Sequence, residues 1–185
     1  MNIKIGVSNH HIHLTKEVLE ILFGKNYELT PKRYLTQLGQ YACEETVTLK
    51  KGKKVLEHVR IIGPCRKYTQ VELLERDNEF FGLNSPVRKS GDLIGSETIT
   101  IIGPKGEYEA VESTIIADRH IHMSAEDLKT FNVKNDKVVT VKVNNGVTLD
   151  DVHIKSDSTC VLEMHMNKDE AEKLGIETGN EVTIC

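Results

Sequence analysis

One stretch of this sequence occurs twice, and the two copies constrain the fold more than any other feature. Residues 9–19 align with residues 118–128, so that His120 follows His11 by 109 positions. Each copy contains His-x-His, and two positions later it has Thr or Ser, which are favoured residues at the start of a helix. The repeat predicts two related units, each with a strand that ends in His-x-His and passes into a capped helix.

Most of the remaining chain consists of short β-runs separated by turn residues. These runs are rich in β-branched residues and lie at 46–50, 55–63, 97–103, 107–111, 137–143 and 147–155. Between the last two runs, Asn145-Gly146 predicts a type I′ hairpin, because both central positions of that turn need a positive φ. Strands so close in sequence can form small closed barrels.

Helices are expected to be few and short. The predicted segments follow the caps Thr15, Ser124 and Asn167 and cover 16–23, 125–131 and 168–174. The sequence therefore predicts a mainly β fold of two small barrels related by internal duplication and capped by short helices.

Length and charge exclude several classes of protein. At 185 residues the chain is shorter than the roughly 250 residues of a typical TIM barrel, and a net charge of −4 without a basic stripe disfavours nucleic acid as a partner. No apolar run reaches the roughly 20 residues of a membrane span, and no secretory signal begins the chain. The four cysteines form no C-x-x-C pair, as expected for reduced thiols in a cytosol.

The two His-x-His pairs are the first candidates for chemistry. Successive side chains of a strand alternate between faces, so His11 and His13 project to the same side, as do His120 and His122. A single pair is weak support for a metal site, but two copies in a repeat favour one. Histidine with carboxylate suits zinc first, with iron, nickel or cobalt as alternatives.

Two pairs do not complete two coordination shells, so further ligands are expected. His165 precedes a predicted helix as the other pairs do, and Glu72 is a strand carboxylate in an apolar setting. An exposed strand residue remains the alternative for Glu72. An oxyanion would need a cation as well, and Arg66 and Arg88 lie in turn-rich segments that can present a guanidinium.

Other residues fit structural roles better. Glu17 and Glu126 mimic a cupin ligand spacing, but each falls in the first turn of a predicted helix, where the dipole favours an acid. Of the remaining histidines, His58 and His153 lie in long strand runs and fit solvated strand faces, and His10 is expected on the opposite face from His11 and His13.

Five motifs in order resemble one known family. They lie at residues 7–14, 63–72, 85–92, 117–124 and 162–165, and together they closely resemble the propanediol-utilisation type of phosphate propanoyltransferase, a phosphotransacylase. The resemblance implies two β-barrel domains, one formed by 1–9 plus 118–185 and the other by 10–117, with a dinuclear metal site, usually zinc, between them.

The same resemblance assigns residues to roles. The implied metal ligands are His11, His13, Glu72, His120, His122 and His165. Arg66 falls on the family's phosphate-binding arginine, and coenzyme A contacts fall near Ser8, Arg33 and Arg60. The implied cofactors are two divalent metal ions.

The implied reaction converts a short-chain acyl-CoA, propanoyl-CoA or acetyl-CoA, and phosphate to acyl phosphate and CoA, reversibly. The alternatives are a dinuclear metallohydrolase of phosphoesters or thioesters and a non-catalytic metal-binding module. Residues 2–5 already form the first predicted strand, with no N-terminal helix of the kind that directs relatives into microcompartments. This favours a cytoplasmic enzyme with no membrane partner, and a homo-oligomer such as a dimer is left open.

Overall fold

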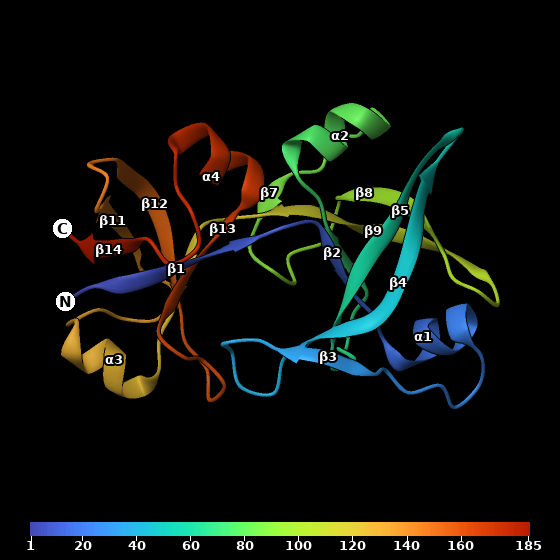
Figure 1. Cartoon of the computed structure of the whole chain (residues 1–185), viewed down its shortest axis with the longest axis horizontal. Helices are drawn as coiled ribbons and strands as arrows, with labels where there is room; N and C mark the ends of the chain where they lie inside the picture. The colour runs from blue at the N-terminus through green and yellow to red at the C-terminus, as the bar shows by residue number, and fades with distance from the viewer. The chain divides into compact units, whose positions relative to one another are not determined.

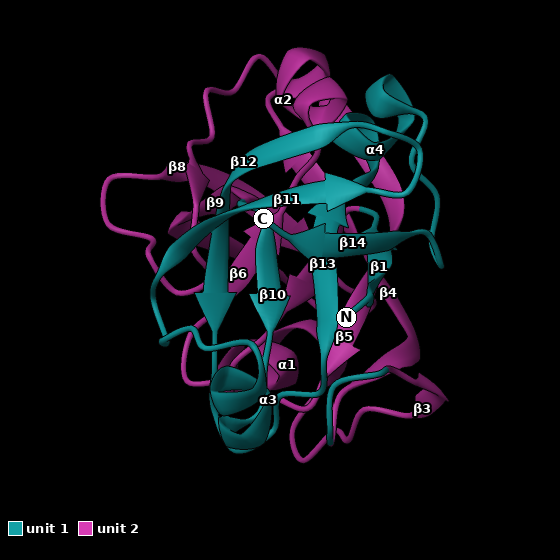
Figure 2. Cartoon of the chain, turned by 90° about the vertical axis from the view of Figure 1, so that its left-hand side faces the viewer, with its two compact units in different colours: residues 1–9, 36–38, 118–185 teal, residues 10–35, 39–117 magenta.

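The computed structural model describes all residues, 1–185, and confirms a mainly β protein with four short helices (Figure 1). The chain divides into two compact units (Figure 2). Unit 1 comprises Met1–Asn9, Thr36–Leu38 and Asp118–Cys185, and unit 2 comprises His10–Leu35 and Gly39–Ala117. The predicted pair of barrels is confirmed, one in each unit.

Six strands of unit 1 close into a barrel. In order around the barrel they are β1 (Ile3–Ser8), β13 (Glu163–Asn167), β10 (His120–His122), β12 (Thr148–Lys155), β11 (Val138–Val143) and β14 (Glu181–Ile184). Alternate residues such as Ile5, Ile121 and Met164 are at most 1% exposed and fill the interior. The two helices of this unit are α3 (Ala125–Thr130) and α4 (Lys168–Leu174).

Unit 2 forms a second ring of six strands with two additional short ones. The ring runs through β4 (Tyr41–Lys51), β5 (Lys54–Gly63), β2 (His11–His13), β6 (Gln70–Glu72), β9 (Glu107–Ala117) and β8 (Glu97–Ile102), which pairs with β4 again. The additional strands are β3 (Pro31–Tyr34) beside β4 and β7 (Val87–Arg88) beside β9. Its helices are α1 (Lys16–Phe23) and α2 (Glu75–Phe81).

The His-x-His strands occupy equivalent positions in the two barrels. In unit 2, β2 pairs in parallel with β5 and antiparallel with β6, and β6 pairs in parallel with β9. In unit 1, β10 pairs in parallel with β12 and antiparallel with β13, and β13 pairs in parallel with β1. β1 directly precedes β2 in the sequence, but β1 pairs with strands of unit 1 and β2 pairs with strands of unit 2. In the same way β9 directly precedes β10, but β9 pairs within unit 2 and β10 pairs within unit 1.

Three predicted helices are present and begin at the expected caps. The side chains of Thr15, Ser124 and Asn167 each accept a hydrogen bond from a backbone N–H three residues later. The fourth helix, α2, was not predicted because it follows Leu74, which has no capping side chain. Instead, the Asp77 carboxylate accepts a hydrogen bond from the Leu74 N–H at 2.8 Å.

The hairpin between β11 and β12 is confirmed, but its predicted turn type was wrong. Gly146 has a φ of 96°, whereas Asn145 is not in the positive-φ region. The Gly146 N–H donates to the Val143 carbonyl at 2.9 Å, and the Val147 N–H donates to Asn145 Oδ1 at 3.1 Å. A three-residue loop in which one glycine has a positive φ, stabilised by the Asn145 side chain, therefore replaces the type I′ turn.

Candidate functional site

In unit 2, three side chains from two adjacent strands converge. Glu72 is the direct antiparallel partner of His11, and its Oε2 lies 3.3 Å from His11 Nε2. Its other oxygen, Oε1, lies 3.4 Å from His13 Nε2. We call His11, His13 and Glu72 the unit 2 triad. The alternation predicted from the sequence is confirmed here, since both histidines point to the same carboxylate.

The charge state of the unit 2 triad favours a cation. Burial is the main cause that lowers the pKa of His13 from 6.5 to about 4; Glu72 partly offsets it, and Arg66 and His11 lower the pKa further. Burial alone would raise the pKa of Glu72, but the charges and hydrogen bonds of His11 and His13 hold it well below its usual 4.5. At neutral pH the triad therefore combines a neutral His13 with a carboxylate anion.

In unit 1, three imidazoles converge in the equivalent place. His165 is the antiparallel partner of His120, and its ring centroid lies 4.6 Å from that of His122. His120 Nε2 and His122 Nε2 are 3.1 Å apart. We call His120, His122 and His165 the unit 1 triad.

Backbone carbonyls at Nδ1 orient the rings of His13 and His120. The Ile62 carbonyl oxygen lies 3.1 Å from His13 Nδ1, and the Asp118 carbonyl oxygen lies 2.9 Å from His120 Nδ1. His122 Nδ1 lies 3.4 Å from Cys160 Sγ. A carbonyl can only accept, so Nδ1 of His13 and His120 carries the hydrogen and Nε2 keeps its lone pair.

Both donor sets fit a divalent ion of the zinc type. Within each triad the candidate ligand atoms all lie within 4.8 Å of one another. Two nitrogens bound to a tetrahedral zinc at about 2.0–2.1 Å would be about 3.3–3.4 Å apart, close to the 3.1 Å between the Nε2 atoms of His120 and His122. Two Nε2 lone pairs at this separation repel each other unless a cation or a proton lies between them.

Arg66 lies in the same unit as the first triad and is held by its neighbours. Its backbone N–H donates to the Leu14 carbonyl at 2.8 Å, and its Nη1 donates to Ser90 Oγ at 3.2 Å. The charge of Arg66 contributes to the lowered pKa of His13, so the guanidinium is close enough to act on the triad.

Gln70 and Ser90 were not predicted as site residues. Gln70 Nε2 donates to Glu72 Oε1 at 2.7 Å and to Ser90 Oγ at 2.9 Å, and Gln70 Oε1 accepts from the Gly91 N–H at 2.7 Å. This network links the triad carboxylate to the residue that contacts Arg66. Segment 85–92 is rich in turn residues, but its contact with Gln70 depends on folding.

The three predicted coenzyme A contacts occupy different surroundings. Ser8 ends β1, and its hydroxyl donates to the Met166 carbonyl at 3.3 Å. Arg33 is exposed on β3. Arg60 Nη1 donates to the carbonyls of Cys43 and Glu44, both at 2.8 Å, so this guanidinium is already hydrogen-bonded to β4.

The remaining predicted bystanders lie outside the triads. Glu17 and Glu126 occupy first helical turns, as predicted. His10 Nδ1 lies 3.1 Å from Asp77 Oδ2, and His153 Nε2 lies 3.4 Å from Asp118 Oδ2. Neither His10 nor His153 belongs to a cluster that could hold a metal ion.

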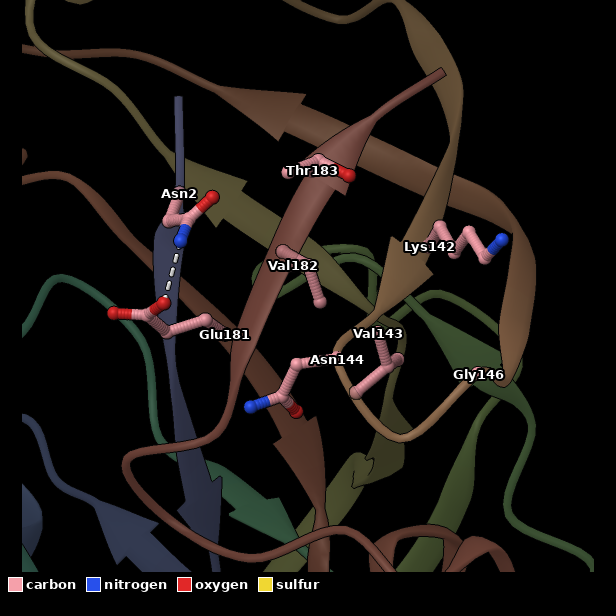
Figure 3. Close-up of a pocket in the computed structure, with 8 residues that line it drawn as sticks. All are labelled: Asn2, Lys142, Val143, Asn144, Gly146, Glu181, Val182 and Thr183. Carbon is pink, nitrogen blue, oxygen red and sulfur yellow. Dashed lines mark hydrogen bonds between the residues drawn. The ribbon is translucent and has the colours of Figure 1, made fainter.

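An open hollow of about 420 Å³ lies on unit 1, between β1, β11 and β14 (Figure 3). Asn2 and Glu181 form a hydrogen bond of 2.6 Å at one side of it, and Lys142 lies at the opposite side. None of its lining residues is a candidate ligand or a predicted substrate contact.

No helix of the structure has the length and apolar character needed to cross a membrane.

Comparison with known proteins supports the resemblance found in the sequence. The family model described as phosphate propanoyltransferase matches residues 4–177. A phosphate propanoyltransferase of Thermotoga maritima is 46% identical over 97% of this chain and 87% of the relative. Those of Lachnoclostridium phytofermentans and Clostridioides difficile are 45% and 40% identical, over 98% and 96% of this chain and 86% of each relative.

The family match and the similarity to these relatives show that the chain is an acyltransferase. More specifically, the chain belongs to the phosphate propanoyltransferase family.

Proposed function

We propose that the protein transfers a short acyl group, propanoyl or acetyl, reversibly between coenzyme A and phosphate. In this proposal each triad binds one divalent metal ion, for which zinc is the first candidate. The single observation that carries this proposal is the unit 2 triad, whose carboxylate is linked through Gln70 and Ser90 to Arg66. A cation site beside a guanidinium suits a phosphate, because both groups neutralise an oxyanion.

The reaction joins a phosphate oxygen to the thioester carbonyl carbon. As the C–O bond forms, negative charge develops on the carbonyl oxygen; the C–S bond then breaks, and the CoA thiolate leaves and takes a proton from solvent. Bound metal ions would supply positive charge for the phosphate and for this developing oxyanion. Arg66 would hold a phosphate oxygen through its planar fork, and Ser90 fixes the guanidinium at 3.2 Å.

Direct transfer without an acyl-enzyme is supported by the state of three thiols and of the Ser90 hydroxyl. Burial raises the pKa of the Cys43 thiol to about 12 and also raises the pKa of Cys65 and Cys160. These thiols are protonated at neutral pH and are poor nucleophiles. The hydrogen bonds to the Ser90 hydroxyl come from Arg66 and Gln70, which are donors and cannot serve as a base.

Coenzyme A is proposed to contact Ser8, Arg33 and Arg60. Of the two arginines, Arg33 is the exposed one and the better candidate for a CoA phosphate. Arg60 already donates to two carbonyls, and it would have to contact CoA through its remaining N–H groups.

The test is release of CoA from propanoyl-, acetyl- and butanoyl-CoA with and without phosphate, with acyl phosphate trapped by hydroxylamine. The proposal expects CoA release to require phosphate and to match acyl phosphate formed. CoA release that is independent of phosphate would instead indicate a thioester hydrolase. Zinc binding without any CoA release would indicate a metal-binding module.

A further inference from the structure

The third member of each triad is Glu72 in unit 2 and His165 in unit 1. In both units, the residue two positions earlier in the sequence contacts this third ligand. In unit 2, Gln70 lies opposite His13 and donates to Glu72 Oε1 at 2.7 Å. In unit 1, Glu163 lies opposite His122, and its Oε2 is 2.6 Å from His165 Nε2. The two units thus repeat this support as well as the ligands.

The chemistry of the supporting residue matches the ligand that it contacts. A carboxylate ligand can only accept, and Gln70 supplies a donor; an imidazole N–H can donate, and Glu163 supplies an acceptor. We propose that Glu163 is a positioning residue, which takes the Nε2–H of His165 and leaves Nδ1 as the nitrogen that binds the metal ion. This inference rests on the proposed metal site of unit 1.

The β1 strand leaves space for the Glu163–His165 pair. Gly6 is the strand partner of His165, and a Cβ at Gly6 would lie 3.1 Å from Glu163 Cδ and 3.3 Å from His165 Cδ2. The equivalent position in unit 2, where the third ligand is Glu72, is the fully buried Ile115. A side chain at Gly6 would press on both members of the pair.

A short segment holds the other oxygen of the Glu163 carboxylate. Thr36 Oγ1 donates to Glu163 Oε1 at 3.0 Å. The neighbouring Gln37 is only 3% exposed and forms hydrogen bonds of 3.0 and 2.9 Å with the carbonyl and N–H of Val161. With Oε1 bound to Thr36 and Oε2 to His165, the carboxylate is already engaged and is better suited to orient His165 than to serve as a fourth ligand.

Support of this kind is a measurable part of metal binding. A carboxylate that accepts the second N–H of a ligating histidine fixes its tautomer and ring orientation, and losing such a partner lowers metal affinity roughly 10-fold to 100-fold. The effect should be confined to the unit 1 triad, since Glu163 and its contacts all belong to that unit.

The test compares zinc-loaded wild type with Glu163→Gln, Glu163→Ala and Thr36→Val. Zinc affinity of each site is measured by chelator competition, and long-range ¹⁵N NMR of the histidine rings gives the tautomer of His165, assigned by its loss in His165→Gln. Glu172→Gln is the matched control, because its carboxylate is in an exposed pair with Lys168 at 3.7 Å.

We expect His165 to carry hydrogen on Nε2 and zinc on Nδ1. Glu163→Ala should weaken one site about 10-fold to 100-fold. Glu163→Gln, whose amide oxygen can still accept from His165, and Thr36→Val should weaken it less, and the control should match wild type. If Glu163→Ala does not fold, Thr36→Val and the wild-type tautomer still decide the question. Zinc on Nε2 of His165, or two unchanged sites in Glu163→Ala, overturns this inference alone, whereas wild-type protein that binds no zinc overturns the proposed metal function with it.

Discussion

Glu72 lies directly opposite His11 in the antiparallel pair of β2 and β6, with its Oε2 3.3 Å from His11 Nε2. The equivalent partner of His120, in β10 and β13, is His165. Directly opposite side chains in an antiparallel pair have Cβ atoms about 4.5–5.5 Å apart, so strand register brings the third ligand of each triad to its histidines. The duplicated fold therefore builds the same three-residue arrangement twice, with a carboxylate in one copy and an imidazole in the other.

Replacing Arg66 should separate turnover from metal binding. Arg66→Ala should keep both metal ions and lower kcat about 100-fold to 1,000-fold, because a preorganised charge would no longer stabilise the transition state. Steady-state kinetics and elemental analysis measure the two effects. Lys168→Ala is the control, since Lys168 is in an exposed pair with Glu172 at 3.7 Å. Loss of metal in Arg66→Ala would show that the arginine acts through the triad.

The buried His13 should make the metal-free protein less stable in acid. Its pKa is about 4 when folded and 6.5 when unfolded, so below pH 6.5 the unfolded chain binds a proton that the folded protein does not. The free energy of unfolding should fall as the pH drops from about 6.5 to about 4, by about 2–3 kcal/mol at pH 4.5. Urea unfolding at several pH values measures this for wild type and His13→Gln. The free energy of unfolding should fall less steeply with decreasing pH in His13→Gln, while the control His58→Gln should follow wild type. Equal slopes for wild type and His13→Gln would contradict the assignment.

The thiol beside His122 should influence zinc affinity without taking part in acyl transfer. Cys160 is buried, with Sγ 3.4 Å from His122 Nδ1 and 3.6 Å from the Lys155 carbonyl. Cys160→Ala should weaken zinc binding about 10-fold and leave no acyl-enzyme to trap in either protein. Chelator competition and mass spectrometry after incubation with acyl phosphate are the measurements, with the exposed Cys185→Ala as control. A covalent acyl group lost only in Cys160→Ala would instead make this thiol a nucleophile.

The acids that follow each His-x-His should be dispensable for metal binding. Hydrogen bonds from the Glu17 backbone and Thr15 at the helix start lower the pKa of Glu17, and neither Glu17 nor Glu126 belongs to a triad. Glu17→Gln and Glu126→Gln should therefore retain full metal content and lower only thermal stability, slightly. Elemental analysis and thermal unfolding check this. Loss of one metal ion in either variant would indicate that the replaced glutamate is a ligand, as in the cupin spacing.

The features that could be predicted from the sequence are local ones. Strand alternation was sufficient to place His11 and His13 on one face, and Thr15 and Ser124 marked where two helices begin. The repeat predicted two units. The strand-end position of His165 and the apolar strand around Glu72 made both residues candidates, and the resemblance to a family assigned them as ligands. The helix after Leu74 was not predicted, because its capping group is the carboxylate of Asp77, the third residue of the helix, and not a side chain at the position before the helix.

The residues that support the ligands could not be predicted, because their contacts depend on strand register and on loops far away in sequence. Gln70 meets Ser90 across 20 positions, and Thr36 meets Glu163 across 127. The lack of a Cβ at Gly6 leaves space for Glu163 and His165, which lie far from it in the sequence. Positions of this kind become visible only after the barrels are closed.

Metal stoichiometry tests the central claim most directly, namely that each unit holds one ion on its own triad. Elemental analysis of purified, zinc-loaded protein should give two ions per chain for wild type, one for His13→Ala, one for His122→Ala and none for the double variant. Glu17→Gln and Glu126→Gln, which change nearby acids outside the triads, should both keep two. Two ions retained in either single histidine variant, or none bound by the folded wild type, would contradict the account.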